Sequence, residues 1–301
     1  MAIKHTISEQ RIHAGERAVP CRAAGTEADA PVVLCLHGFP DIAASFDAQL
    51  PALAAAGYRA IAPTLRGYHP DWQSADNAYQ TAALADDAVA LLDALDIEQA
   101  VIFGHDWGAA IAGAVAAIAP ERVRALITAA VPYGGSLGSS FVTDLDQQRR
   151  SWYMFFFQTP FAEAAALHAD LAFIRRLWQD WSPTWAFTEA DIRPVLDALA
   201  QPGVMAAAIQ YYRCALNPEH QHERYATAQA KVGATLAMPC LHLHGNEDGC
   251  IDAGMTAGMD ASFSGPLEIE LLDGLGHFLH REDPAMINAL VLDFLARHAP
   301  S

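Results

Sequence analysis

Positive charge is scarce in this chain. Lysine occurs only twice in 301 residues, at Lys4 and Lys231, and 35 acidic residues stand against 18 lysines and arginines, which gives a formal net charge of −17. A surface of this sign repels phosphate backbones and anionic lipid headgroups. The composition therefore argues against nucleic acid and anionic membranes as partners.

Long apolar runs and a secretion signal are also missing. No stretch of about 18 uninterrupted apolar residues occurs, so no membrane span is predicted. Residues 1–5 lack the basic and then apolar layout of a signal peptide. We therefore expect a cytoplasmic protein without a membrane partner.

Cysteine is sparse and irregularly spaced. The residues are odd in number and include no C-x-x-C pair, which favours reduced thiols over a disulfide or a zinc site. They are Cys21, Cys35, Cys214, Cys240 and Cys250. His242 and His244 have no acidic or thiol partner at a suitable spacing, so we expect no metal ion there. No cofactor is predicted.

What the chain does contain is an alternation of strand and helix patterns. Two short alternating stretches, 4–12 and 17–23, predict an edge hairpin. Strand patterns follow at 31–36, 58–63, 101–105 and 123–131, separated by helical patterns at 43–56, 79–95 and 107–120. This order predicts a mostly parallel sheet with helices on both faces and ligands at the carboxyl ends of the strands.

The alternation stops after residue 131. Residues 132–231 show helical patterns, many aromatic residues and no clear strand, and such an insertion would lie over the site as a lid. Strand patterns return at 239–245 and 267–272, before a last helix at 284–299. We therefore predict an α/β fold with a core domain of residues 1–131 and 232–301 and an α-helical cap of residues 132–231.

The sharpest local signal is G-H-D-W-G at residues 104–108. A strand pattern precedes it and an alanine-rich helical pattern follows, so the small residues around Asp106 favour a tight turn that exposes its side chain, as in a nucleophile elbow. A carboxylate in this place can displace a leaving group at a saturated carbon and form an alkyl ester. Taken alone, the stretch is equally compatible with an N-capping aspartate.

Two further polar residues follow the last two strand patterns, Asp248 the first and His277 the second. The chain order Asp106, Asp248, His277 is the nucleophile, acid and histidine order of α/β-hydrolases. Glu247 is an alternative for the orienting acid, because it directly precedes Asp248. Three cues on successive strand ends favour a catalytic site over a helix cap.

Together these motifs resemble those of α/β-hydrolases of the epoxide hydrolase family, over essentially the whole chain. The family's H-G-x-P, G-x-D-x-G and G-H-F motifs match residues 37–40, 104–108 and 276–278. The resemblance implies a cofactor-independent hydrolase with a mostly parallel eight-stranded sheet, flanking helices and an α-helical cap inserted after the sixth strand. It also favours Asp248 over Glu247, because Asp-Gly-Cys matches the family pattern.

The resemblance further implies two cap tyrosines that donate hydrogen bonds to an epoxide oxygen. Matched by motif, they are Tyr153, in W-Y-M-F-F-F-Q at 152–158, and Tyr212, in Y-Y-R at 211–213. Tyr211 is an alternative for the second, because the two stand side by side. Without the resemblance, two tyrosines in an aromatic lid indicate packing more often than catalysis.

The predicted reaction has two steps. Asp106 attacks an epoxide carbon while the phenols of Tyr153 and Tyr212 support the departing oxygen. His277, oriented by Asp248, then activates a water that cleaves the ester and releases a vicinal diol.

Other residues are expected to support this chemistry. The backbone N–H groups of Phe39 and Trp107 are predicted to hold the oxyanion, with His37 ordering the first of these loops and His105 supporting the elbow. The predicted substrate contacts are Trp152, Phe157 and Phe278. The lid aromatics line a tunnel or form the lid core, and either use favours an apolar or aromatic substrate.

Several other functions are compatible with parts of this pattern. A haloalkane dehalogenase shares the aspartate and could hold its halide with the Trp107 indole, although Phe39 stands where such enzymes commonly have asparagine. A haloacetate dehalogenase is less favoured, because Ala109 and Ala110 stand where a carboxylate-binding arginine is expected. A non-catalytic ligand-binding protein would not need all five catalytic residues, and an esterase would need a hydroxyl at the elbow.

The expected partners are a small-molecule epoxide and water. A homodimer is one option for assembly, and detoxification is one option for cellular use.

Overall fold

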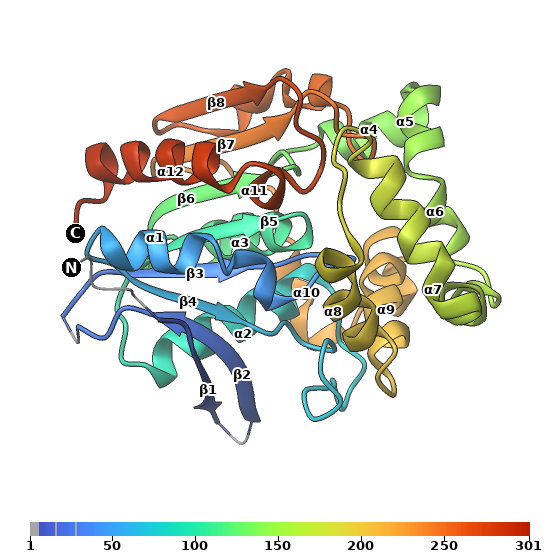
Figure 1. Cartoon of the computed structure of the whole chain (residues 1–301), viewed down its shortest axis with the longest axis horizontal. Helices are drawn as coiled ribbons and strands as arrows, with labels where there is room; N and C mark the ends of the chain where they lie inside the picture. The colour runs from blue at the N-terminus through green and yellow to red at the C-terminus, as the bar shows by residue number, and fades with distance from the viewer. Residues whose placement is uncertain (1–5, 16, 28) are drawn as a thin grey trace.

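The computed structural model describes residues 6–15, 17–27 and 29–301, and these form one eight-stranded sheet with helices around it (Figure 1). The hydrogen-bonded order of the strands is β1-β2-β4-β3-β5-β6-β7-β8. Their bounds are β1 Ser8–Ala14, β2 Arg17–Ala24, β3 Val32–Leu36, β4 Arg59–Pro63, β5 Ala100–His105, β6 Val123–Ala129, β7 Cys240–Gly245 and β8 Leu267–Leu272. β2 is antiparallel to β1 and β4, and the later pairs are parallel. The predicted mostly parallel α/β fold is confirmed.

The central strands β3 and β5 are fully buried because helices cover both faces of the sheet. One face carries α1 (Gln49–Ala55), α11 (Leu279–Glu282) and α12 (Pro284–His298), and the other carries α2 (Thr81–Ala94) and α3 (Trp107–Ile118) (Figure 1). Alternate residues of β3 enter two separate cores: Val33 and Cys35 on the α12 side, Leu34 and Leu36 on the α3 side. A strand buried on both faces needs such a continuous apolar run.

The N-terminal hairpin pairs β1 with β2, with Ser8 opposite Ala23 and Ala14 opposite Arg17. The predicted edge hairpin is therefore confirmed over residues 8–12 and 17–23. Residues 4, 5 and 16 of that prediction lie outside the described residues, as do residues 1–3.

One predicted helix is interrupted. The helical pattern at 43–56 forms a 3₁₀ turn at Ala43–Phe46 and then the separate helix α1, which begins at Gln49. Pro51 explains the break, because a proline in a helix interior lacks the N–H that bonds four residues back and its ring crowds that carbonyl. A helix that begins at Gln49 places Pro51 in the first turn, where it is tolerated.

Helices and no strand lie between β6 and β7, as predicted. They are α4 Ser136–Thr143, α5 Leu145–Arg150, α6 Trp152–Phe156, α7 Ala162–Trp181, α8 Glu189–Leu199, α9 Val204–Leu216 and α10 Ala226–Gln229, and we refer to them as the cap helices. In Figure 1, α4 to α9 stand beyond the carboxyl ends of the central strands. The loops that follow β3, β5 and β7 therefore face them.

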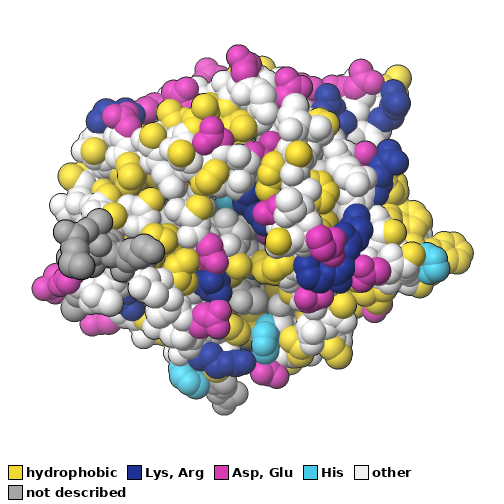
Figure 2. Space-filling model, in the orientation of Figure 1, with side chains coloured by type: hydrophobic (Ala, Val, Ile, Leu, Met, Phe, Trp, Pro, Cys, Tyr) yellow, Lys and Arg dark blue, Asp and Glu magenta, His cyan; other side chains and the backbone are white. Residues whose placement is uncertain are grey.

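The surface mixes charged and apolar side chains. Figure 2 shows acidic and basic side chains interspersed over this face, and hydrophobic atoms protrude at the edge where α6 and α7 lie in Figure 1. Among the described residues, the most exposed large hydrophobic side chains lie between β6 and β7: Val142 on α4, Leu145 on α5 and Phe161 just before α7. In the described part of the chain, no helix combines the length and the apolar character needed to cross a membrane. All five cysteines are buried as free thiols.

Candidate active site

Asp106 occupies a strained turn between β5 and α3. Its φ and ψ are 53° and −120°, a conformation that non-glycine residues rarely adopt and that clusters at functional sites. The turn needs glycine on both sides, because a Cβ on Gly104 would lie 2.0 Å from the Gly108 carbonyl oxygen and one on Gly108 would lie 1.8 Å from that of Leu36. The Asp106 side chain makes no N-cap hydrogen bond to α3, so the capping alternative loses its support.

The Asp106 carboxylate lies against the loop that follows β3. The Phe39 N–H donates a hydrogen bond of 2.7 Å to Oδ1 of Asp106. Gly38 allows this approach, because a Cβ there would lie 2.3 Å from the same oxygen. Trp107 is the second predicted oxyanion donor. Among the described residues, its backbone N–H donates no hydrogen bond to Asp106.

His37 orders the loop that carries Phe39. Its Nε2 accepts a hydrogen bond of 3.1 Å from the Leu65 N–H, which leaves Nδ1 to donate to the Gly38 carbonyl at 3.0 Å. Burial lowers the pKa of His37 to about 4, so the ring is neutral at pH 7 and can accept in this way. The ring thereby ties the oxyanion loop to the neighbouring loop after β4.

His277 stands between two carboxylates. Its Nδ1 lies 2.9 Å from Oδ2 of Asp248, and its Nε2 lies 3.5 Å from Oδ2 of Asp106. Burial alone would lower the pKa of His277, but the two carboxylates outweigh it and raise the pKa to about 10. The imidazole is therefore protonated at pH 7. His105 supports this arrangement, because its Nε2 lies 2.9 Å from the His277 carbonyl oxygen.

Asp248, not Glu247, is the acid that reaches the histidine. Asp248 is 2% exposed, and its Oδ1 accepts hydrogen bonds from the N–H groups of Cys250 at 2.7 Å and Ile251 at 2.9 Å. These bonds leave Oδ2 directed at His277. Glu247 is exposed to solvent, so the structure favours the predicted choice between the two.

The two predicted tyrosines come together from separate cap helices, Tyr153 from α6 and Tyr212 from α9. Both are 1% exposed, and their ring centroids lie 5.4 Å apart. The Tyr153 hydroxyl lies 3.4 Å from Sγ of Cys250, whereas that of Tyr212 has no hydrogen-bond partner among the described residues. Burial, joined for Tyr212 by the charge of Asp106, raises both pKa values well above the ordinary range. Both phenols are therefore protonated hydrogen-bond donors at pH 7.

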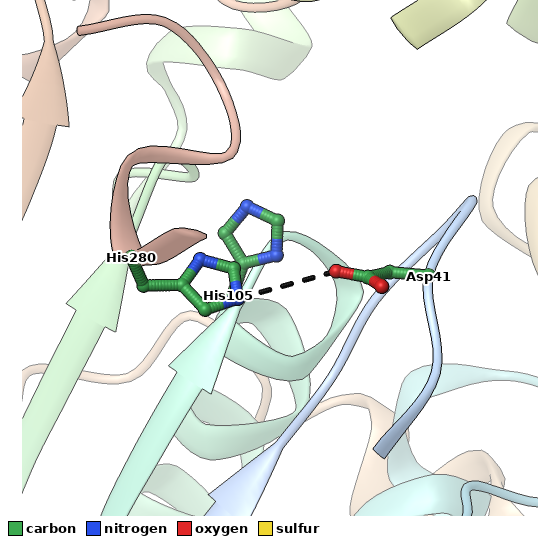
Figure 3. Close-up of side chains that lie close together, drawn as sticks. All are labelled: Asp41, His105 and His280. Carbon is green, nitrogen blue, oxygen red and sulfur yellow. Dashed lines mark ion pairs between the residues drawn. The ribbon is translucent and has the colours of Figure 1, made fainter. Parts of the chain in front are cut away.

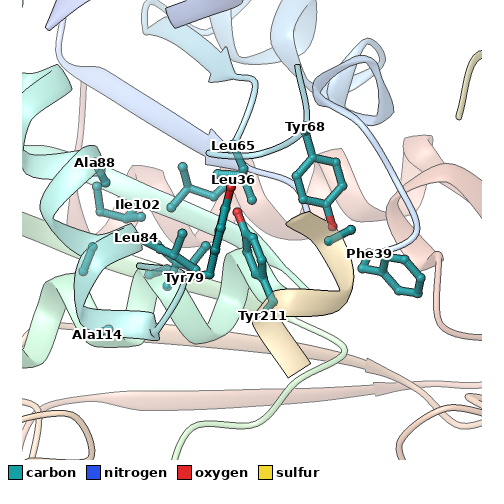
Figure 4. Packing of buried hydrophobic residues seen from close by; sticks show 14 of the residues in the cluster. Leu36, Phe39, Leu65, Tyr68, Tyr79, Leu84, Ala88, Ile102, Ala114 and Tyr211 are labelled. Atoms are coloured by element: carbon teal, nitrogen blue, oxygen red, sulfur yellow. The ribbon is translucent and has the colours of Figure 1, made fainter. Parts of the chain in front are cut away.

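Tyr211 has a different role from Tyr212. Its hydroxyl donates a hydrogen bond of 2.6 Å to the Arg66 carbonyl, and its ring lies 5.7 Å from that of Tyr79 and 5.8 Å from that of Tyr68. Figure 4 shows Tyr211 within this buried cluster beside Tyr79. The donor of Tyr211 is already committed to the protein, which favours Tyr212 as the second catalytic tyrosine.

The three predicted substrate contacts occupy different places. Phe157 is buried and packs against both Tyr153 and Tyr212, while Phe278 is buried with its ring 5.2 Å from that of His277. Trp152 is 42% exposed and packs on Phe173 at 5.3 Å. Neighbouring residues of a helix point about 100° apart, so the rotation that turns Tyr153 inward turns Trp152 outward. We do not retain Trp152 as a substrate contact.

A buried polar cluster that the sequence does not predict lies beside His277. Figure 3 shows the Asp41 carboxylate directed at the His280 ring, with His105 beside it. His280 Nε2 lies 4.0 Å from Oδ2 of Asp41, and the rings of His280 and His105 are 4.3 Å apart. The signals in the sequence are slight: Asp41 directly follows H-G-F-P, and His280 comes three residues after His277.

Asp41, His105 and His280 are close enough to share a metal ion, but the electrostatics oppose one. The Arg281 guanidinium lies 3.3 Å from Oδ1 of Asp41 and carries a fixed positive charge. Protonated His277 adds a second positive charge nearby, and both charges contribute to lowering the pKa of His280, after burial. A third cation in this space would be repelled.

His242 and His244 are structural residues of β7. His242 pairs with the Thr128 hydroxyl at 2.8 Å and with His244 at 3.2 Å, and His244 also lies 3.0 Å from the Ile251 carbonyl. Their ring nitrogens are thus engaged within the protein. Among the described residues, Asp248, Cys250 and His277 form a second group with a suitable spacing, and hydrogen bonds link Asp248 to both of the others.

Comparisons with known proteins show the family and the fold. The chain matches the alpha/beta hydrolase fold family over residues 31–284. It is 33% identical to epoxide hydrolase A of Mycobacterium tuberculosis over 89% of this chain and 91% of that protein. It is 32% identical to an epoxide hydrolase of Caballeronia sordidicola over 88% and 87% of the two chains. The crystal structure of a Klebsiella pneumoniae protein provisionally assigned as an epoxide hydrolase superposes with a TM-score of 0.84 at 32% identity, over 95% and 97% of the chains.

Proposed function

Since the chain belongs to the alpha/beta hydrolase fold family and, within it, to the epoxide hydrolases, we propose that it converts an apolar or aromatic epoxide to a vicinal diol through a covalent ester on Asp106. The observation that carries the proposal is the set of groups around Asp106: a histidine 3.5 Å from its Oδ2, and two buried phenols in ring contact with each other, one of which packs on Phe39, whose N–H donates to Asp106. Residues 132–231 would act as a cap domain that excludes bulk water from this site.

Ring opening needs a nucleophile and an acid on opposite sides of the epoxide. An oxygen of Asp106 attacks one epoxide carbon, and the bond from that carbon to the ring oxygen breaks. The ring oxygen would otherwise leave as an alkoxide, so Tyr153 and Tyr212 donate hydrogen bonds and one of them transfers its proton. The products are a hydroxyalkyl ester on Asp106 and a phenolate.

Loss of the Asp106 charge then changes His277. In the resting site two carboxylates raise its pKa to about 10, but the ester is neutral, so one of the two stabilising charges disappears and the pKa of His277 falls. The phenolate can take up the proton that His277 gives up. Alkylation thereby prepares the neutral imidazole that the second step requires.

The second step cleaves the ester. Neutral His277, held by Asp248 at 2.9 Å, removes a proton from a water, and the water oxygen bonds to the carbonyl carbon of the Asp106 ester. The Phe39 N–H, which donates to Oδ1 in the resting site at 2.7 Å, is placed to stabilise the tetrahedral oxyanion. Collapse releases the diol oxygen, which takes the proton of the new carboxyl group and restores the Asp106 carboxylate and protonated His277.

The experiment that tests this function scores products. Purified enzyme is offered styrene oxide and, separately, 1-bromobutane, and the diol and bromide are measured. We expect diol from the epoxide and no bromide, because two phenols suit a developing alkoxide. Bromide without diol would overturn the proposal in favour of a haloalkane dehalogenase, and neither product would favour a ligand-binding protein.

A further inference from the structure

A cavity of about 710 Å³ adjoins the proposed catalytic site on one side. It lies between the segment that follows β6 and the helix α9. The rings of Trp107 and Tyr212, in edge-to-face contact at 5.1 Å, form its inner wall. Trp107 is the neighbour of Asp106 in the chain, and the ring of Tyr212 lies 5.4 Å from that of Phe39, whose N–H donates a hydrogen bond to the Asp106 carboxylate. A molecule that reacts at Asp106 can therefore extend into this cavity.

The lining of this cavity is uncharged. None of its 19 lining residues, all within the described part of the chain, is Asp, Glu, Lys, Arg or His. This contrasts with a surface cavity of about 620 Å³ beside α5 and α7, most of whose lining residues are acidic or arginine. Apolar contacts come from residues such as Leu137, Phe141 and Met154. Such a lining binds apolar groups and imposes a desolvation cost on charged ones.

The aromatic rings that surround the tyrosine pair outside the cavity lining are closely packed. The ring of Tyr153 lies 4.9 Å from that of Trp181, and the ring of Phe39 lies 5.6 Å from that of Phe157. All four side chains are 1% exposed or less. Enlarging a substrate toward these rings would require them to move, and overpacking a filled interior is costly.

From this asymmetry we infer that the cavity receives one large, uncharged substituent of the epoxide, and that the enzyme favours epoxides with a bulky apolar group on one carbon and little or nothing on the other. The inference rests on the proposed function and adds the shape of the substrate to it. A cavity of this volume lies within the range that holds a drug-sized ligand, so an aryl or arylalkyl group fits.

Two small residues of the lining determine how much room the substituent has. Ala215 lies on α9, three residues after Tyr212 and so on the same side of the helix, and it is exposed. Gly138 lies on α4, and a Cβ added there would meet no atom within 4 Å. A larger side chain at Gly138 therefore has room at its base, and one at exposed Ala215 would extend from the cavity lining.

The test compares a large and a small substrate in cavity-filling variants. Ala215→Trp and Gly138→Phe are assayed with benzyl glycidyl ether and with propylene oxide. We expect kcat/KM for benzyl glycidyl ether to fall roughly tenfold or more and that for propylene oxide to stay within about twofold. The matched control is Ala164→Trp, an equal change at an exposed helical alanine on α7 outside the lining, which should affect neither substrate.

A charged substrate provides the second arm. The wild-type enzyme should turn over phenyl glycidyl ether much faster than its 4-carboxylate analogue, by roughly tenfold or more, because the carboxylate would be desolvated without a partner. Equal rates for these two ethers, or an equal loss for large and small epoxides in both cavity variants, would overturn the inference while leaving epoxide hydrolysis intact. Absence of diol from every epoxide with the wild-type enzyme would instead defeat the proposed function, and the inference with it.

Discussion

Nε2 of His277 lies 3.5 Å from Oδ2 of Asp106, so the proposed nucleophile and the proposed base form an ion pair before substrate arrives. This pair, together with the bond from Nδ1 to Asp248, raises the pKa of His277 to about 10 despite burial. A histidine that activates water would more simply be expected to have a neutral imidazole at pH 7. The pairing instead links the basicity of the histidine to the charge of the nucleophile.

Neutralising Asp106 should therefore lower the pKa of His277. In Asp106→Asn, turnover is lost, and the imidazole titrates at a lower pH than in the wild-type enzyme because one stabilising carboxylate is gone. The titration can be followed by NMR of the His277 ring. The control Glu247→Gln removes a negative charge at an exposed position near the site and should leave the titration in place. An unchanged titration in Asp106→Asn would contradict the proposed coupling.

Removing the base should separate the two steps. His277→Gln is expected to undergo one alkylation by styrene oxide and then stop, because no group remains to activate water for ester cleavage. Intact-mass analysis should show one substrate mass added per enzyme molecule. The double variant Asp106→Asn/His277→Gln should show none, which locates the ester. A His277→Gln enzyme that binds an epoxide and gains no mass would argue against a covalent intermediate.

The neighbouring tyrosines of α9 should differ sharply. Tyr153→Phe and Tyr212→Phe should each slow alkylation by roughly 10²- to 10⁴-fold, the usual range for loss of an acid catalyst. Tyr211→Phe should keep its activity and lose about 1 kcal/mol of unfolding free energy, because it gives up one buried hydrogen bond to the Arg66 carbonyl. Single-turnover rates and urea unfolding measure the two effects. Slower alkylation in Tyr211→Phe than in Tyr212→Phe would reverse the assignment.

The acid beside the histidine should matter mainly for hydrolysis. Asp248→Asn is expected to slow ester cleavage by roughly 10²- to 10⁴-fold, because the amide can no longer stabilise the imidazolium that forms at His277. The ester should then accumulate at steady state. Glu247→Gln, an adjacent and exposed change of the same kind, should leave the rate of diol release unaltered. Equal effects of the two substitutions would mean that Asp248 does not orient the base.

Features encoded by nearby residues could be predicted from the sequence. Asp106 was found because the glycines at 104 and 108 and the change from strand to helix pattern are local, and their close contacts in the structure explain why both must be glycine. The strands were found because buried strands in a parallel sheet need continuous apolar runs. The helical pattern around Pro51 is continuous and predicts a single helix over 43–56, although Pro51 marks the break before α1.

Features that depend on how helices are rotated and packed could not be predicted. Neighbouring residues on α6 and α9 point in different directions, and only tertiary structure shows that Tyr153 and Tyr212 turn inward while Trp152 faces solvent. The contact between Tyr153 and Cys250 joins α6 to the loop after β7. The uncharged cavity likewise combines segments far apart in the sequence, and no local pattern reports such a juxtaposition.

The most direct test of the account is the source of the oxygen in the diol. A single turnover of styrene oxide is run with enzyme in excess in H₂¹⁸O, and the diol and the peptide that contains Asp106 are analysed by mass spectrometry. Attack by Asp106 followed by ester cleavage predicts that the new diol oxygen is ¹⁶O from the aspartate and that ¹⁸O appears in Asp106. ¹⁸O in the first-turnover diol, with none in Asp106, would mean that water attacks the epoxide directly and would contradict the covalent mechanism.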